Sequence, residues 1–125
     1  MIIGVPKEIK NHEYRVGLTP SSVRELVSLG HEVFIQTHAG VGVGFKDADY
    51  QSAGAVILQT AEDIFARSEL IVKVKEPQLD ECKMLRSDQV LFTYLHLAPD
   101  PEQTAGLINS KCIAIAYETV TDDRG

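Results

Sequence analysis

The sequence predicts an α/β protein built on a doubly wound, mostly parallel sheet with helices on both faces. Two observations indicate this. Short apolar, β-branched runs that suit buried parallel strands alternate with amphipathic segments that carry helix-capping signals. The length of 125 residues and the 44% apolar content suit one folded domain with a substantial core. Such alternation is typical of Rossmann-like and flavodoxin-like sheets.

The predicted strands span residues 1–5, 32–37, 55–58, 70–74, 90–95 and 112–117. The predicted helices span residues 20–29, 47–53, 60–67, 79–85 and 100–109. Thr19 before Pro20 forms an N-cap, and Gly30 stands where a helix commonly ends in a left-handed residue. Thr60, and Asp100 followed by a proline, mark two further helix starts.

Two connections need separate interpretation. Residues 7–18 are polar and lack periodicity, which predicts a loop long enough to be functional. The glycine-rich residues 39–45 do not fit a dinucleotide-binding turn, because GxGxxG would require a glycine where Phe45 stands. We expect a connecting loop there. The sequence ends soon after a strand, without a closing helix, so we expect the sheet to be incomplete at the C-terminus and the chain to be part of a longer one.

Composition argues against several classes of function. The net charge is −6 without a basic run, so neither nucleic acid nor an anionic membrane is an expected partner. No apolar run approaches the roughly 20 residues of a membrane span, and no signal peptide is seen.

Cys82 and Cys112 have neither zinc nor disulfide spacing, and Cys112 is expected to be a small buried hydrophobe. A cytoplasmic protein is predicted. No metal site is expected, because the remaining histidines are scattered: His12, His31 and His38.

Polar side chains follow two apolar strands at their C-terminal ends, where open α/β sheets bind ligands. Lys73 and Lys75 follow one strand, and alternation would put them on the same face. They either guard an edge strand or include a donor to a substrate oxygen, for which position favours Lys75, with Glu76 holding its charge. His96 follows the next strand and is either a hydrogen-bonded, partly buried histidine or a general acid/base.

Two further residues are candidates for the same crevice. Arg15, in the long loop, is either a solvated arginine or a bidentate clamp for a carboxylate. Glu118 follows the last strand and is a candidate second acid.

Five sequence blocks resemble the N-terminal part of the bacterial alanine dehydrogenases, a family related to the pyridine nucleotide transhydrogenases. The blocks keep the family's order and spacing and lie at residues 3–8, 13–20, 72–77, 94–98 and 114–119. The resemblance implies that Arg15 binds the carboxylate of alanine or pyruvate, that Lys75 contacts the same substrate and that His96 is the catalytic acid/base. Gly17 departs from the motif, because alanine is usual there.

The resemblance also implies a function for the complete protein: NAD-dependent, reversible oxidative deamination of L-alanine to pyruvate and ammonia, in a homohexamer. Residues 1–125 would be its substrate domain. The NAD-binding domain and a second catalytic residue would lie outside this sequence, so the chain alone is expected to be inactive. Two alternatives are the N-terminal domain of a transhydrogenase alpha subunit and a non-catalytic remnant that binds a carboxylate or a partner.

Overall fold

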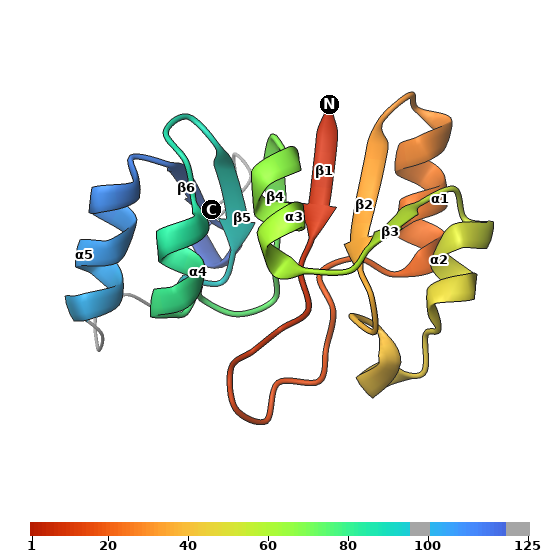
Figure 1. The fold of residues 1–125 in the computed structure, drawn as a ribbon, viewed down its shortest axis with the longest axis horizontal. Coiled ribbons are helices and arrows are strands. Elements are labelled where there is room, and N and C mark those ends of the chain that lie inside the picture. Colours follow the sequence, from red (N-terminus) through yellow and green to blue (C-terminus); the bar gives the residue numbers. More distant parts are fainter. Residues whose placement is uncertain (96–100, 120–125) are drawn as a thin grey trace.

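The computed structural model describes residues 1–95 and 101–119. Within them, a six-stranded sheet has the order β3-β2-β1-β4-β5-β6, and every paired strand is parallel to its neighbour (Figure 1). The strands are β1 (Ile2–Val5), β2 (Glu32–Gln36), β3 (Val56–Leu58), β4 (Leu70–Val72), β5 (Val90–Thr93) and β6 (Ile113–Ala116). The helices are α1 (Pro20–Ser28), α2 (Asp47–Ser52), α3 (Ala61–Arg67), α4 (Leu79–Met84) and α5 (Pro101–Ser110), with short 3-10 turns η1 (Val41–Val43) and η2 (Tyr117–Thr119). The predicted fold class is confirmed.

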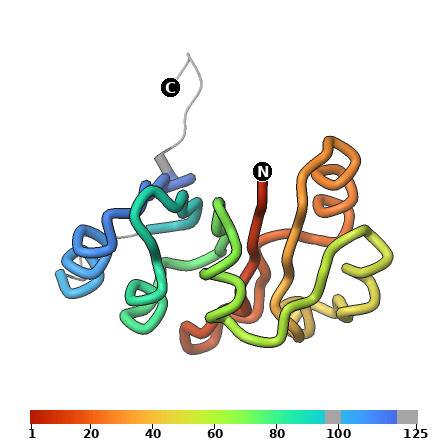
Figure 2. The backbone as a smooth tube through the Cα atoms, turned by 45° about the horizontal axis from the view of Figure 1, so that its top comes forward, coloured from red at the N-terminus to blue at the C-terminus, as the bar shows by residue number. Residues whose placement is uncertain are grey.

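The strand order reverses direction between β1 and β4. The chain moves outward from β1 through β2 to β3, returns to pair β4 with β1, and then moves outward the other way. Such a switch point leaves a crevice beyond the carboxyl ends of the two central strands. The long loop after β1 lies at that end of the sheet, away from the N-terminus (Figures 1 and 2).

Helices cover both faces of the sheet. One apolar core joins α1 and α2 to the sheet and contains Ile3, Val5, Val23, Val33, Ile35, Ala39, Tyr50, Ala53 and Ala55. A second core joins α3, α4 and α5 to the opposite face and contains Phe34, Leu58, Ile64, Phe65, Ile71, Cys82, Leu85, Leu91, Leu95 and Leu107. Val33 and Ile35 point into one core and Phe34 into the other, as strand alternation requires.

The predicted helix signals act as expected. Thr19 Oγ1 accepts the Ser22 N–H at 3.2 Å, and Thr60 Oγ1 accepts the Asp63 N–H at 3.1 Å. Each such cap contributes about 1 kcal/mol. Gly30 has φ of 92°, the left-handed conformation that a residue past a helix end favours. The predicted cap at Asp100 lies outside the described residues.

Three details differ from expectation. β4 ends at Val72 and β5 at Thr93, each two residues before its predicted end. Cys112 is only partly buried, since it precedes β6 at the edge of the sheet. The loop at residues 39–45 forms η1 and leads into the six-residue α2, so the prediction of a connecting loop is confirmed. None of the described helices is long and apolar enough to span a bilayer.

Candidate functional site

Lys73 lies at the crevice between β1 and β4 and is enclosed by two carboxylates. Its ammonium donates to Glu8 Oε1 at 3.0 Å and lies 2.9 Å from Glu81 Oε2. The expectation that it shares a face with Lys75 is wrong, because the strand ends before Lys73 and alternation no longer applies. The edge-strand alternative is also wrong, since β4 is central in the sheet. Lys73 is therefore a buried structural cation.

Glu8 was missed by sequence reasoning and is central to this arrangement. Besides Lys73, its carboxylate accepts the backbone N–H of Val74 at 3.2 Å and of Lys75 at 3.1 Å. The side chain comes from the loop after β1 and reaches the chain after β4. One signal was available: a lysine that follows a buried strand needs a counterion, and adjacent strand ends are where one would be found.

Lys75, in contrast, has no ion pair within the described ranges, although it lies beside charged groups. Its carbonyl accepts the Thr93 hydroxyl at 2.8 Å, and its ammonium lies 5.0 Å from the centre of the Tyr94 ring. Glu76, expected to hold this charge, forms its ion pair with Lys10 instead. Lys75 thus presents a partly exposed cation in a fixed backbone position.

Arg15 is held by its neighbour Glu13. The guanidinium donates from Nε at 3.0 Å and from Nη2 at 2.7 Å to the two carboxylate oxygens, and the backbone N–H of Arg15 adds a bond of 2.9 Å. The Arg15 hydrogen bond lowers the pKa of Glu13 from its ordinary 4.5 to about 2, with a smaller contribution from Lys75. Glu13 in turn raises the pKa of Arg15. Glu13 uses one side of the guanidinium, so Nη1 remains available for a second carboxylate.

Glu8, Glu13 and Arg15, but neither Lys73 nor Lys75, border an open cavity of about 300 Å³. It lies between the loop after β1 and the loop after β2 and is lined by Lys7, Glu8, Glu13, Tyr14, Arg15, His38, Ala39, Val41 and Gly42. The loop after β1 is closely packed on both sides: a Cβ at Gly17 would lie 2.6 Å from the Val72 carbonyl oxygen, and one at Gly42 would lie 2.7 Å from that of Tyr14. An alanine at position 17 would therefore require this loop to shift.

Aromatic residues from β5, from the position after its end and from η2 pack together beside the chain that follows β4. The Tyr117 hydroxyl donates to the Val74 carbonyl, and its ring lies 5.4 Å from Phe92 and 6.4 Å from Tyr94, between ring centres. Burial raises the pKa of Tyr117, whereas the charge of Arg15 acts to lower it. The arginine is thus electrostatically coupled to the aromatic wall.

Glu118 lies near the end of β5. Its Oε1 accepts the Leu95 N–H at 2.7 Å, which ties the end of β6 to the residue before His96. His96 itself lies outside the described residues, so its assignment as an acid/base remains a prediction.

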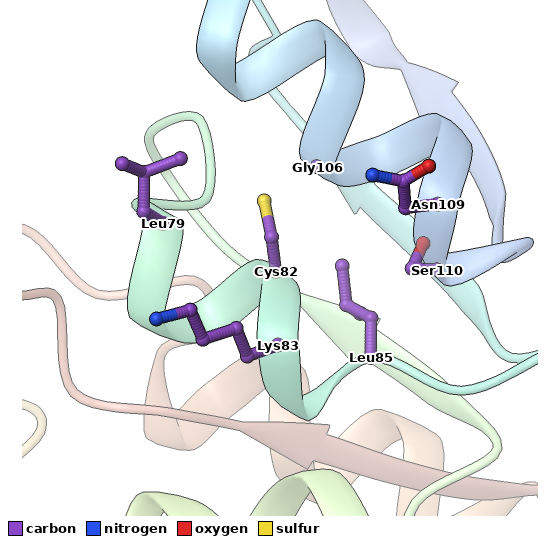
Figure 3. Close-up of a pocket in the computed structure, with 7 residues that line it drawn as sticks. All are labelled: Leu79, Cys82, Lys83, Leu85, Gly106, Asn109 and Ser110. Carbon is purple, nitrogen blue, oxygen red and sulfur yellow. The ribbon is translucent and has the colours of Figure 1, made fainter.

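A larger cavity of about 410 Å³ lies elsewhere, between α4 and α5 (Figure 3). The Cys82 side chain projects toward α5 beside Gly106, and a Cβ on that glycine would lie 3.1 Å from Cys82 Cβ. Its lining has Lys83 as the sole charged residue. This space reflects how two helices pack, and the charges gathered at the crevice make it the candidate site.

Neither metal ligation nor dinucleotide binding is supported by the side chains of the described residues. No group of three or more potential metal-ligating His, Cys, Asp or Glu residues occurs within it. The β1–α1 connection, where a Rossmann sheet carries its glycine-rich phosphate turn, is here the long loop that carries Glu8 and Arg15. These residues do not fit a nicotinamide dinucleotide.

Comparison with known proteins places this arrangement in a family. Residues 4–125 match the model of the alanine dehydrogenase/PNT N-terminal domain. The chain belongs to this family. It is 54% identical to an alanine dehydrogenase of Halomonas elongata over 125 residues and 51% identical to that of Bacillus subtilis over 124 residues. These alignments cover 100% and 99% of this chain but 34% and 32% of the relatives, so the chain spans about a third of their length.

Solved structures agree with this membership. An L-alanine dehydrogenase superposes with a TM-score of 0.95 at 56% identity, covering 99% of this chain and 34% of that one. A transhydrogenase from Sinorhizobium meliloti superposes with a TM-score of 0.90 at 28% identity, covering 99% and 37%. The two share the fold with this chain, and the first is much more similar in sequence.

Proposed function

We propose that residues 1–125 are the substrate domain of an NAD-dependent L-alanine dehydrogenase. The complete protein would convert L-alanine reversibly to pyruvate and ammonia. The observation that supports this proposal is that Arg15 and Lys75 both act on Glu13, which lowers its pKa, in a chain about half identical to alanine dehydrogenases along its whole length. NAD would be held by protein beyond these residues, because those described here do not fit it.

Each proposed role follows from chemistry. The remaining N–H groups of Arg15 would take the carboxylate of alanine or pyruvate, since a guanidinium fork matches a carboxylate. Lys75 would stabilise negative charge that develops on the substrate oxygen, in a position that its backbone bonds already hold. His96 would move the protons, because imidazole titrates near neutral pH. We also propose a cytoplasmic homohexamer for the complete protein, on the strength of the family resemblance.

The test uses the full-length gene product and follows NADH oxidation in the presence of pyruvate and ammonia. Arg15→Lys should raise the KM for pyruvate by about tenfold or more, because lysine cannot reproduce a bidentate contact. Arg24→Lys, an exposed position on α1, is the matched control and should leave KM unchanged. Hydride transfer between nucleotides without a need for pyruvate would contradict the proposal and favour a transhydrogenase.

A further inference from the structure

Three charged side chains are buried together at the switch point. The exposed fractions of the Glu8, Lys73 and Glu81 side chains are 2%, 1% and 2%, and they come from three segments: the loop after β1, the chain after β4, and α4. Burying ions costs several kcal/mol each, and replacing a buried ionic cluster by apolar side chains is often neutral or stabilising. Stability alone therefore does not account for this cluster.

The bonds of Glu8 indicate what else it does. β4 stops pairing with β1 at Ile71, so the N–H groups of Val74 and Lys75 have no strand partner there. The Glu8 carboxylate accepts both of them and takes the place of the missing strand. On the other side of the chain, Thr93 donates its hydroxyl to the Lys75 carbonyl. The backbone of Lys75 is thus held by a carboxylate at its N–H and by a buried threonine at its C=O.

The same side chain fixes the second half of the site. Glu8 belongs to the loop that carries Glu13 and Arg15, and a second ion pair, Lys10 to Glu76, joins this loop to the chain after β4. The separation between Arg15 and Lys75 therefore depends on contacts between segments 65 to 67 residues apart in sequence. Lys73 supplies the counterion that allows Glu8 to stay charged when buried.

We propose that Glu8 is a positioning residue of the substrate site, which sets the backbone of Lys75 and its distance from Arg15 so that both cations meet one small carboxylate substrate. This inference rests on the proposed function, because it assigns Arg15 and Lys75 to substrate binding. The Glu8 side chain is 2% exposed, and its carboxylate is already engaged by Lys73, Val74 and Lys75. It acts through the N–H of Lys75 and through its own loop.

Glu8→Gln in the full-length protein is the test. Glutamine has one acceptor oxygen where three N–H groups now converge, so Lys75 loses its fixed position. We expect the KM for pyruvate to rise about ten- to hundredfold, the scale of a misplaced binding group, while the KM for ammonia stays within about twofold. A rise in KM for pyruvate alone would indicate misplacement of Lys75, because general loss of structure would raise the KM for both substrates.

Two control variants separate positioning from stability. Glu69→Gln makes the same chemical change at the other end of the same strand pair, where Glu69 accepts the Ile2 N–H at 2.7 Å, and should leave every KM unchanged. Glu81→Gln neutralises the other carboxylate on Lys73 without touching the Lys75 backbone. It should lower the melting temperature about as much as Glu8→Gln but raise the pyruvate KM much less.

The outcomes are distinct. Equal pyruvate KM values in the Glu8→Gln and Glu81→Gln proteins, with an active wild type, would overturn the positioning role and leave the proposed function standing. A wild type that neither binds nor consumes pyruvate would overturn both. If Glu8→Gln does not fold, the double variant Glu8→Gln, Lys73→Met removes the unpaired ammonium, and the same comparison is made against Lys73→Met, Glu81→Gln.

Discussion

The two flanks of the sheet are built from similar apolar strands but are covered very differently. In β2, Val33, Phe34 and Ile35 are 1%, 2% and 0% exposed, because α1 packs on one face and α3 on the other. In β6, Ile113 and Ile115 are 50% and 42% exposed. Among the described residues, helices cover the β5–β6 flank on the α4 and α5 face only. Apolar sequence therefore does not by itself decide burial; a helix must also cross that face.

The crevice lies at the boundary between these flanks. There the chain buries charge instead of apolar side chains, and two lysines two residues apart differ in nearly every respect. Lys73 is 2% exposed and has two carboxylate partners, whereas Lys75 is half-buried and has no ion pair in the described part of the chain. Four substitution experiments test how far this contrast between covered and open regions extends.

The largest effect is expected at Lys73. Lys73→Met leaves two buried carboxylates without their cation, and we expect it to lower the free energy of unfolding by about 3–5 kcal/mol. Lys75→Met is the matched control, with a loss of less than about 0.5 kcal/mol, since that ammonium has no carboxylate partner in the described residues. Urea denaturation measures both. Equal decreases in the free energy of unfolding for Lys73→Met and Lys75→Met would show that Lys73 is not the structural cation.

A second pair compares the flanks directly. Ile35→Ala on β2 should lower the free energy of unfolding by about 2–5 kcal/mol. The reason is that Ile35 is 0% exposed, so the shorter side chain leaves a cavity beneath α1. Ile115→Ala on β6, at 42% exposure, should cost less than half as much. The same denaturation series measures the two values. A full-sized loss at Ile115 would mean that something covers β6 in solution.

A third pair compares two tyrosine hydroxyls, one on each flank. Tyr50 is 0% exposed and donates to the Leu18 carbonyl at 2.8 Å, and Tyr117 donates to the Val74 carbonyl. Tyr50→Phe should lower the free energy of unfolding by about 1 kcal/mol, the net worth of one such bond. Tyr117→Phe should lower the free energy of unfolding by less, because water can reach the Val74 carbonyl once the hydroxyl is gone. Thermal unfolding measures both losses. A larger loss for Tyr117→Phe than for Tyr50→Phe would contradict this prediction.

The smallest effect is expected from Glu13, whose ion pair borders water. Its folded pKa of about 2 lies below the ordinary 4.5, so the stability that it contributes is complete above pH 4.5 and is lost as the pH falls toward 2. The free energy of unfolding of wild type minus that of Glu13→Gln should therefore shrink over this range. Burial raises the pKa of Glu81, which acts in the opposite direction but is common to both proteins and cancels. A difference that does not change with pH would contradict the assigned pKa.

Much of the fold follows from local sequence signals. Thr19 with Pro20, Thr60 and Gly30 marked helix ends by capping chemistry that acts within a few residues, and these predictions are confirmed. Position after a strand predicted that Lys75 and His96 lie at one crevice, because the carboxyl ends of parallel strands share an edge; this stays a prediction, since His96 lies outside the described residues. The ends of β4 and β5 were predicted two residues late, since their last residues turn into contacts with distant parts of the chain.

The sequence by itself determined the alternation of strands and helices, the caps, the expectation of a crevice and the family to which the chain belongs. Those features depend on neighbours along the chain, or on motifs that can be compared. Only the tertiary structure decided which lysine is buried and which carboxylates hold it. The partners of Lys73 lie on other segments, and electrostatic pairing of buried groups depends on distances that folding alone sets.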